Sequence, residues 1–346
     1  MTRIRYVSPG VAAVLAVVAI AAGLAAGKVA FGGTDAGGGA GESRVAGTKI
    51  DVITKATDSE FWQVMLAGAK KAGADQGVDL GLFGPTSETD IDGQVKLVEN
   101  SISRGADAIV LAANSSTALN GVVDRARKQG IKVITVDNRI TTQTEGFIGT
   151  DNIKAGQQAG ERLCKLMTDR GDPDGKIVHE SSVSGVQVLI DRFTGFKEGL
   201  AKDCPDAEVV QTLVNDNDLN KAVGQVGDVL TSRPDVVGIF ADNNTSGTGA
   251  ARAIQEKNAA DRVVSVAFDS DPAEVGAVRS GTLSAIVVQN PFFFGYQGVV
   301  EAAMAVRGTL PPVNLDPGAV LIDRTNVGRP EFAALLNPPK TKGEGG

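Results

Sequence analysis

The chain has 346 residues, of which 42% are hydrophobic and 22% charged, a composition typical of a soluble globular protein of about two domains. The formal net charge of −7 argues against nucleic acid as a partner, because proteins that bind it usually carry a basic surface. The single histidine, His179, and the two cysteines, Cys164 and Cys204, form no cluster in the sequence. We therefore expect no metal site and no cofactor.

Residues 1–30 are predicted to be a targeting segment. Arg3 and Arg5 precede the apolar residues 11–26, and a charged region followed by an apolar one is the order of a secretory signal. No cysteine follows closely, which excludes a lipid-modified N-terminus. A cleaved signal peptide is favoured over an uncleaved membrane anchor, and either one places the remainder outside the cytoplasm. Residues 31–48 are rich in glycine and predict a flexible linker.

Strands and helices alternate from residue 49 onward. In the first half, strands are predicted in the segments KIDVIT, VDLGLF, DAIVLA and KVITVD. Between them we expect helices over residues 61–76 and 117–128, and another whose apolar face carries Ile91, Val95, Val98 and Ile102. The order resumes after Gly149, with strands KIVHES, AEVVQTLV and VVGIFA and helices over residues 153–168, 188–201 and 219–230. This alternation predicts two doubly wound α/β sheets.

The two halves resemble each other in sequence. The segment RGADAIVLAANSS in the first half corresponds to SRPDVVGIFADNNTS in the second, and each precedes a strand that ends in aspartate. Ligands of open α/β sheets bind beyond the carboxyl ends of the strands. The side chains expected there are Phe61, Trp62, Asn114, Asp137, Asn243 and Asp269. Amides and carboxylates beside aromatic rings suit a polyhydroxyl ligand such as a sugar.

Simpler interpretations of the same residues remain open. Asn and Asp after strands are also common as turn residues and helix caps, and Phe61 with Trp62 could be a pair in the core. His179 has no partner in the sequence and is interpreted as structural. Neither GDPDGKI nor GTGAAR fits a nucleotide-binding motif well, and no nucleophile–base pair is evident. We therefore predict a binding protein without catalytic residues.

Residues 49–327 also resemble a known family, the periplasmic sugar-binding proteins of the ribose-binding type, which serve ABC importers. The resemblance is carried, in order, by FWQVMLAGAKKA, GPTSETDIDGQVKLVENSISRGADAIVLA, VITVDN, IDRFTGFKEGL, GIFADNN, VAFDSDP and VVQNPFFFGYQGV. It implies two doubly wound lobes joined by three crossovers, with the ligand between them. The N-terminal lobe would comprise residues 49–150 and 290–318, the C-terminal lobe residues 151–289 and 319–335, and a flexible tail residues 336–346.

The resemblance also implies a set of ligand-binding residues. Aromatic rings that sandwich the sugar fall on Phe61 and Trp62, and hydroxyl-binding groups fall on Asp137, Arg192, Asn243, Asp269 and Gln289. Three positions depart from the ribose binder: Ser59 replaces an asparagine, Asn138 an arginine and Asn217 a phenylalanine. These changes argue against ribose itself and leave a related pentose, hexose, sugar alcohol or furanosyl signal.

The implied function is capture of a small neutral sugar or polyol for delivery to the membrane subunits of an ABC permease. The protein is expected to be a monomer that lies in the periplasm or at the cell surface. A membrane-tethered module that senses sugar for a signalling receptor is the alternative. Sugar-responsive repressors are rejected, because a targeting segment occupies the place of their DNA-binding helices. Outside the cytoplasm Cys164 and Cys204 can pair as a disulfide, but two separate thiols remain nearly as plausible.

Overall fold

The computed structural model describes residues 47–309 and 314–340. The predicted targeting segment (1–30), the linker up to residue 46 and the end of the predicted tail (341–346) lie outside the described residues. Within the part that is described, no helix is both long enough and apolar enough to cross a membrane.

The first half of the chain, together with a short strand from near its end, builds a parallel six-stranded sheet in the order β11-β5-β4-β3-β1-β2. Its strands are β1 (Lys49–Ile53), β2 (Asp79–Phe83), β3 (Ala108–Leu111), β4 (Lys132–Val136), β5 (Gly146–Ile148) and β11 (Asn314–Leu315). The central strands β3 and β4 are almost wholly buried and nearly continuous in apolar residues, as expected of parallel strands covered on both faces. We call this sheet and its helices the first lobe.

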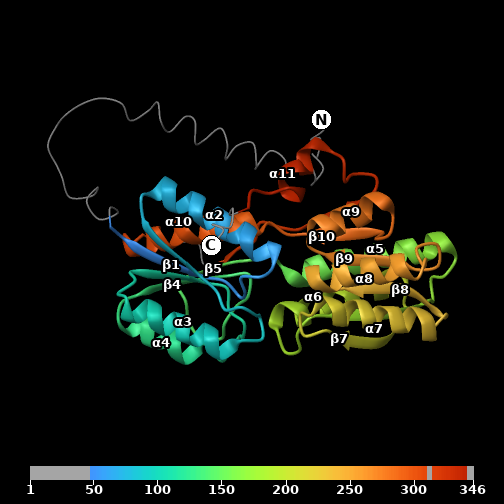
Figure 1. The fold of residues 1–346 in the computed structure, drawn as a ribbon, viewed down its shortest axis with the longest axis horizontal. Helices are drawn as coiled ribbons and strands as arrows, with labels where there is room; N and C mark the ends of the chain where they lie inside the picture. Colours follow the sequence, from blue (N-terminus) through green and yellow to red (C-terminus); the bar gives the residue numbers. More distant parts are fainter. Residues whose placement is uncertain (1–46, 310–313, 341–346) are drawn as a thin grey trace, which may run out of the picture. The chain divides into compact units, whose positions relative to one another are not determined.

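Helices cover both faces of the first sheet (Figure 1). One face carries α2 (Glu60–Gln76) and α10 (Pro291–Val306), and the other carries α3 (Ile91–Ser103) and α4 (Asn120–Lys128). The helices α2 and α10 pack closely because Gly68 and Gly295 face the partner helix, where a Cβ atom would collide with its backbone. Asp90 caps α3 by accepting a hydrogen bond from the Gly93 amide.

The second half builds another six-stranded sheet, in the order β12-β10-β9-β8-β6-β7. Its strands are β6 (Lys176–Ser181), β7 (Glu208–Val214), β8 (Val236–Ala241), β9 (Val264–Phe268), β10 (Ala285–Val288) and β12 (Val320–Asp323). All its pairings are parallel except that of the edge strand β12 with β10. The fold class predicted from the sequence, two doubly wound α/β lobes, is confirmed.

Helices α5 (Asn152–Arg170) and α6 (Gln187–Asp203) pack on one face of the second sheet. The other face is covered by α7 (Leu219–Ser232), α8 (Asn244–Glu256) and α9 (Pro272–Ser280), with the short helices η2 (Pro330–Phe332) and α11 (Ala333–Leu336) at its edge. The period of two in β9 explains this arrangement, since Val264, Val266 and Phe268 face α5 and α6 while Ala267 faces α8. We call this sheet and its helices the second lobe.

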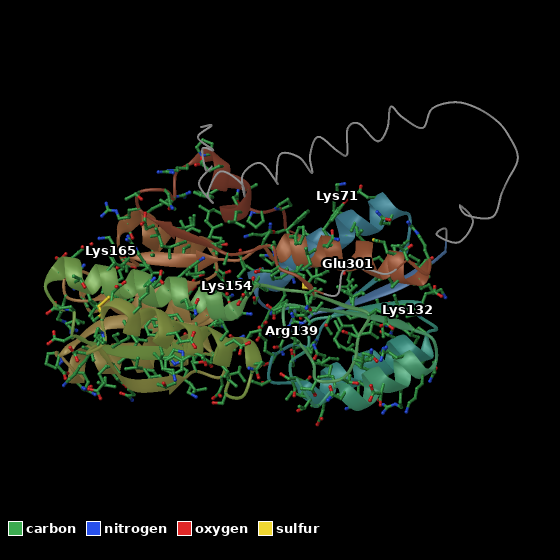
Figure 2. All side chains as sticks on the ribbon, turned by 180° about the vertical axis from the view of Figure 1, so that it is seen from behind. Lys71, Lys132, Arg139, Lys154, Lys165 and Glu301 are labelled. Carbon is green, nitrogen blue, oxygen red and sulfur yellow. A yellow bond between two sulfur atoms is a disulfide. The ribbon has the colours of Figure 1, made fainter. Side chains whose placement is uncertain are left out.

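Cys164 in α5 and Cys204 at the end of α6 form a disulfide, with Cα atoms 5.7 Å apart. Figure 2 shows this bond as a yellow link near the labelled Lys165. The sequence left the pairing open because it predicts the helices but not how closely they pack. Both cysteines are buried in the core between α5, α6 and the sheet.

The chain changes sheet three times. The first change lies between β5 and α5, the second between β10 and α10, and the third between β11 and β12. The family resemblance predicts lobe boundaries at residues 49–150 with 290–318 and 151–289 with 319–335. These exact boundaries stay a prediction.

Candidate functional site

A pocket of about 30 Å³ lies where the carboxyl ends of strands from both sheets meet. We call it the cleft pocket. The first lobe contributes Lys55, Phe61, Trp62, Glu88 and Asp137. The second lobe contributes Ser182, Val186, Val188, Leu189, Arg192, Asn243, Asn244, Asp269 and Gln289. Parallel strands end at the same edge of each sheet, so side chains far apart in the sequence are gathered into one site.

Asp137 and Asp269 occupy equivalent places in the two lobes, directly after β4 and β9. Both have left-handed backbone conformations, with φ of 60° and 82°. Each amide nevertheless continues the ladder, because Asp137 N donates to Ile148 O and Asp269 N to Val287 O, both at 2.9 Å. The backbone therefore turns sharply within an otherwise regular pairing, and strain of this kind gathers at ligand-binding sites.

The carboxylate of Asp269 is held within the second lobe. Its Oδ1 accepts a hydrogen bond from Gln289 Nε2 at 2.8 Å, and its Oδ2 accepts one from the Asn244 amide at 3.1 Å. Burial raises the pKa of Asp269, although the positive charge of Arg192 opposes this shift. Gln289 Oε1 is buried and has no hydrogen-bond partner among the described residues. It is thus placed to accept a hydrogen bond from a bound molecule.

Arg192 lies on α6 and is 3% exposed. Its Nε donates to Asn152 Oδ1 at 2.9 Å, and its Nη1 donates to the carbonyl oxygen of Asp242 at 2.7 Å. The guanidinium group also lies 4.3 Å above the ring of Phe268. These contacts fix the orientation of the planar fork, which can bind two oxygen atoms of a ligand at once.

Phe61 and Trp62 lie in the first turn of α2 and form an edge-to-face pair with ring centroids 4.8 Å apart. Both are buried in the core between α2, α10 and the first sheet, yet both line the cleft pocket. The core interpretation and the ligand-platform interpretation of this pair are therefore compatible. The indole Nε1 of Trp62 donates to Glu88 Oε1 at 2.8 Å, which sets the plane of the ring.

Two charged residues of the pocket were not predicted from the sequence. Lys55 Nζ lies 2.7 Å from Asp137 Oδ2 and 5.6 Å from the ring centroid of Trp62. This ion pair is almost wholly buried, with side-chain exposures of 4% and 5%. Glu88 is the second, and burial raises the pKa of its carboxyl group. Both follow strands β1 and β2, where polar residues also occur in ordinary loops, so no sequence signal separates them.

The charges of the cleft pocket are nearly balanced. Lys55 and Arg192 bring two positive charges, while Glu88, Asp137 and Asp269 are the acidic groups. Burial raises the pKa of Glu88 and of Asp269, which favours their neutral forms and so reduces the negative charge of the pocket. A balanced site of this kind favours a neutral, hydroxyl-rich ligand over an ionic one.

Asn243 lines the pocket and also caps a helix. Its Oδ1 accepts from the Ser246 amide at 2.9 Å, and its Nδ2 donates to Asn217 Oδ1 at 3.0 Å. Its counterpart in the first lobe does not reach the pocket: Asn114 donates instead to the carbonyl oxygen of Lys55 at 3.0 Å. The sequence repeat therefore predicts matching backbone positions in the two lobes, but not which of the two asparagine side chains reaches the pocket.

The three positions that depart from the ribose binder line neighbouring cavities rather than the cleft pocket. Ser59 and Asn217 border a cavity of about 240 Å³, where Asn244 Nδ2 reaches Ser59 Oγ across the lobes at 3.3 Å. Asn138 borders a cavity of about 310 Å³ next to Arg139, which is labelled in Figure 2, and donates to Ala113 O at 2.9 Å. Both cavities adjoin the cleft pocket, since each shares at least one lining residue with it.

His179 lies outside the pocket, as a structural role requires. Its ring stacks between Phe193 and Phe240, with centroids 4.1 and 5.3 Å away. Its Nε2 is 2.9 Å from Asp242 Oδ2, and its Nδ1 is 3.3 Å from Thr212 Oγ1. Among the residues described, no group of three or more His, Cys, Asp or Glu side chains could hold a metal ion.

Comparison with known proteins places this geometry in a family. Residues 50–310 match the family model of the periplasmic binding protein domain. The ribose import binding protein of Haemophilus influenzae is 28% identical over 260 residues, which cover 75% of this chain and 86% of that protein. The D-ribose/D-allose-binding protein of Pseudomonas aeruginosa is 30% identical over 273 residues, covering 76% and 83% of the two chains.

Solved structures agree with these relatives. A carbohydrate transporter solute binding protein from Agrobacterium radiobacter, in complex with D-arabinose, has a TM-score of 0.82 and 33% identity, covering 84% of this chain and 99% of that one. An ABC transporter solute binding protein from Agrobacterium vitis with bound D-fucose has a TM-score of 0.78 and 31% identity, covering 83% and 99%. These relatives are binding proteins of transporters rather than enzymes, which confirms the prediction of a non-enzymatic protein. The chain belongs to the periplasmic binding protein family, in its ribose-binding type.

Proposed function

We propose that this protein captures a small neutral sugar or sugar-like polyol in the cleft pocket and delivers it to an ABC permease. The observation that carries the proposal is the pair Asp137 and Asp269, which project from the same strained position in both lobes toward one pocket. Hydroxyl groups both donate and accept, so they can satisfy these carboxylates together with Arg192 and Gln289. Phe61 and Trp62 would cover the C–H face of the ring.

The relatives support the ligand class. Their names describe binding proteins for ribose and allose, and the solved structures hold D-arabinose and D-fucose. These ligands are uncharged pentoses and hexoses, which agrees with the nearly balanced charges of the cleft pocket. Ser59, Asn138 and Asn217 line the adjoining cavities and would contact the ligand only where it extends beyond the cleft pocket.

Ligand entry requires the pocket to widen. A cavity of about 30 Å³ is well below the volume typical of small-molecule sites, roughly 300–1,000 Å³. The pocket is formed by both lobes, and the chain passes between the two sheets three times. Hinge motion at these connections would open the pocket, and closure around the ligand would give the form that a permease recognises.

A binding protein that serves an importer acts outside the cytoplasm, in the periplasm or at the cell surface, as the family name indicates. We propose that it acts there as a monomer and that its protein partners are the membrane subunits of the permease.

A thermal-shift screen followed by calorimetry tests the proposal. The purified protein is titrated with pentoses, hexoses and sugar alcohols, and a ligand that binds only the folded state raises the melting temperature by mass action. We expect a shift with a small set of related sugars and a matching change in the fluorescence of Trp62, the only tryptophan of the chain. If no sugar or polyol changes either signal, the proposed function is wrong.

A further inference from the structure

The apolar residues that the second lobe contributes to the cleft pocket are all aliphatic. Val186, Val188 and Leu189 line the pocket, and each is between 6% and 8% exposed. They form a small cluster of their own with the half-buried Val183, separate from the large cores of the second lobe. These residues are therefore buried by contacts at the pocket and the adjoining loop rather than by packing against the sheet. We call Val186, Val188 and Leu189 the aliphatic wall.

The local structure at this wall favours a polar residue, which the chain does not supply. Val186 is the N-cap of α6, with φ of −84° and ψ of 122°, and no side chain caps the helix there. Ser, Thr, Asp and Asn are preferred at this position because they accept a hydrogen bond from the first turn. Six other helices follow that rule, with caps at Asp90, Asp151, Asp218, Asn243, Asp271 and Asn290, whereas the N-cap of α4 is the apolar and uncapped Leu119. A position that breaks a local rule is a candidate for a functional one, and Val186 faces the pocket.

Building on the proposed function, we infer that the ligand is a deoxy sugar or methyl-bearing polyol whose methyl group lies against the aliphatic wall. The side chains of the wall offer a hydroxyl group no hydrogen-bond partner, so burying one against them costs free energy. A methyl group there removes apolar surface from water on both sides of the contact. The remaining hydroxyl groups would form hydrogen bonds with Asp137, Arg192, Asp269 and Gln289.

The arrangement of the wall argues for a methyl substituent rather than a bare ring face. Phe61 and Trp62 already supply flat rings for the C–H face of a sugar. The wall instead places branched side chains at three of four consecutive positions around the first turn of a helix. Such a surface is curved, and a group that projects from the ring contacts it better than a flat face does.

Calorimetry with sugar pairs that differ by one oxygen atom tests the inference. Suitable pairs are D-fucose with D-galactose, L-rhamnose with L-mannose, and 5-deoxy-D-ribose with D-ribose. In at least one pair we expect the methyl sugar to bind about 10-fold or more tightly than its hydroxylated partner. If sugars bind but every hydroxylated partner binds as well as its methyl analogue, or better, the inference is wrong and the proposed function stands. If no sugar or polyol binds, both are wrong.

Val186→Thr gives an independent test because it preserves shape and adds a hydroxyl group. The new hydroxyl can cap α6, so we expect a higher melting temperature together with loss of most of the preference for the methyl sugar. Val183→Thr is the matched control, since Val183 belongs to the same cluster but does not line the pocket. It should leave the preference unchanged. An unchanged preference in both Val186→Thr and Val188→Thr would overturn the inference.

Discussion

Asp137 and Asp269 show how single residues shape the cleft pocket. A left-handed backbone is costly for most side chains, on the order of 1–3 kcal/mol, but aspartate and asparagine tolerate it better than others. The same conformation at matched places in both lobes turns two carboxyl groups toward one pocket. Asparagine can therefore replace aspartate with little strain, which allows the charge to be tested separately from the backbone.

We predict that Asp269→Asn weakens sugar binding by about 10- to 100-fold, because hydrogen bonds to a charged group contribute about 1.5–3 kcal/mol. The backbone and the melting temperature of the free protein should change little. Calorimetry with the best ligand of the screen measures the effect. Asp216→Asn is the matched control, because Asp216 also has a left-handed backbone, with φ of 55°, but does not line the cleft pocket. Equal affinity of both variants would contradict the role of Asp269.

Most of the candidate pocket could be predicted from the sequence, but its ion pair could not. The positions derived from the repeat and the family resemblance line the cleft pocket at Phe61, Trp62, Asp137, Arg192, Asn243, Asp269 and Gln289. Lys55 and Glu88 resemble ordinary loop charges until the fold buries them beside Asp137 and Trp62. Their positions in the pocket depend on contacts with residues far away in the sequence, which no local pattern indicates.

At the scale of elements, the start of α5 is linked to the cleft pocket. Asn152 Oδ1 accepts from Arg192 Nε at 2.9 Å, while Asn152 Nδ2 donates to Thr150 O at 3.1 Å, close to the first change of sheet. Asn152 does not line the pocket and is a positioning residue for Arg192. Asn152 therefore connects the first change of sheet to the guanidinium group of the cleft pocket.

We predict that Asn152→Ala lowers sugar affinity by about 10-fold, because Arg192 loses the acceptor that orients its fork and a hydrogen bond to a charged group contributes about 1.5–3 kcal/mol. Asn152→Asp keeps an acceptor for Nε but turns its second oxygen toward Thr150 O, so it should restore only part of the affinity. Calorimetry separates the two variants, and thermal unfolding checks that both are folded. A purely structural role predicts equal losses in both variants, in proportion to their loss of stability.

The disulfide links two helices of the second lobe. Cys164 and Cys204 close a loop with a sequence separation of 40, and a cross-link of that span restricts the unfolded chain. We predict that replacing both with serine lowers the free energy of unfolding by about 2–4 kcal/mol. Denaturant titration measures the loss. Sugar affinity should be unchanged, because neither residue lines the cleft pocket. A large loss of affinity in the folded double variant would show that the helix pair also positions the pocket.

The longer elements were predictable and the shortest were not. Helices such as α5 and α6 carry a clear apolar periodicity, and their predicted bounds agree with the structure within about two residues. The strands β5 and β11 have three and two residues, too few for any period to be visible. They exist because β4 offers an open edge to β5 and β5 in turn to β11. Their formation depends on the tertiary structure rather than on local sequence.

At the scale of the whole molecule, buried acids make stability depend on pH. Burial raises the pKa of Asp271 to about 6, of Glu301 to about 7 and of Glu180 to about 8. The folded state therefore holds these protons more tightly than the unfolded chain, whose carboxyl groups titrate near pH 4. Their contribution to stability is fully present below that value and is lost as the pH rises toward 8.

We predict that Glu180→Gln removes part of this loss. Between pH 5 and pH 8 the wild type should lose stability relative to the variant, by about 1.4 kcal/mol for each unit by which the pKa of Glu180 is raised. Chemical denaturation at several pH values measures the difference. Glu161→Gln, at a half-exposed position, is the control and should run parallel to the wild type. If the wild type and Glu180→Gln show the same pH dependence, Glu180 is not the group responsible.

The position of α10 in the chain has a consequence for how the protein is made. This helix covers one face of the first sheet and packs against α2, yet it begins at Pro291, after the last parallel strand of the second lobe. A ribosome releases the N-terminal residues first, so the nascent first lobe lacks one of its covering helices until nearly the whole polypeptide has emerged. The second lobe also waits for the end of the chain, because its edge strand β12 follows α10. We therefore expect neither lobe to be complete until the C-terminal part of the chain has emerged.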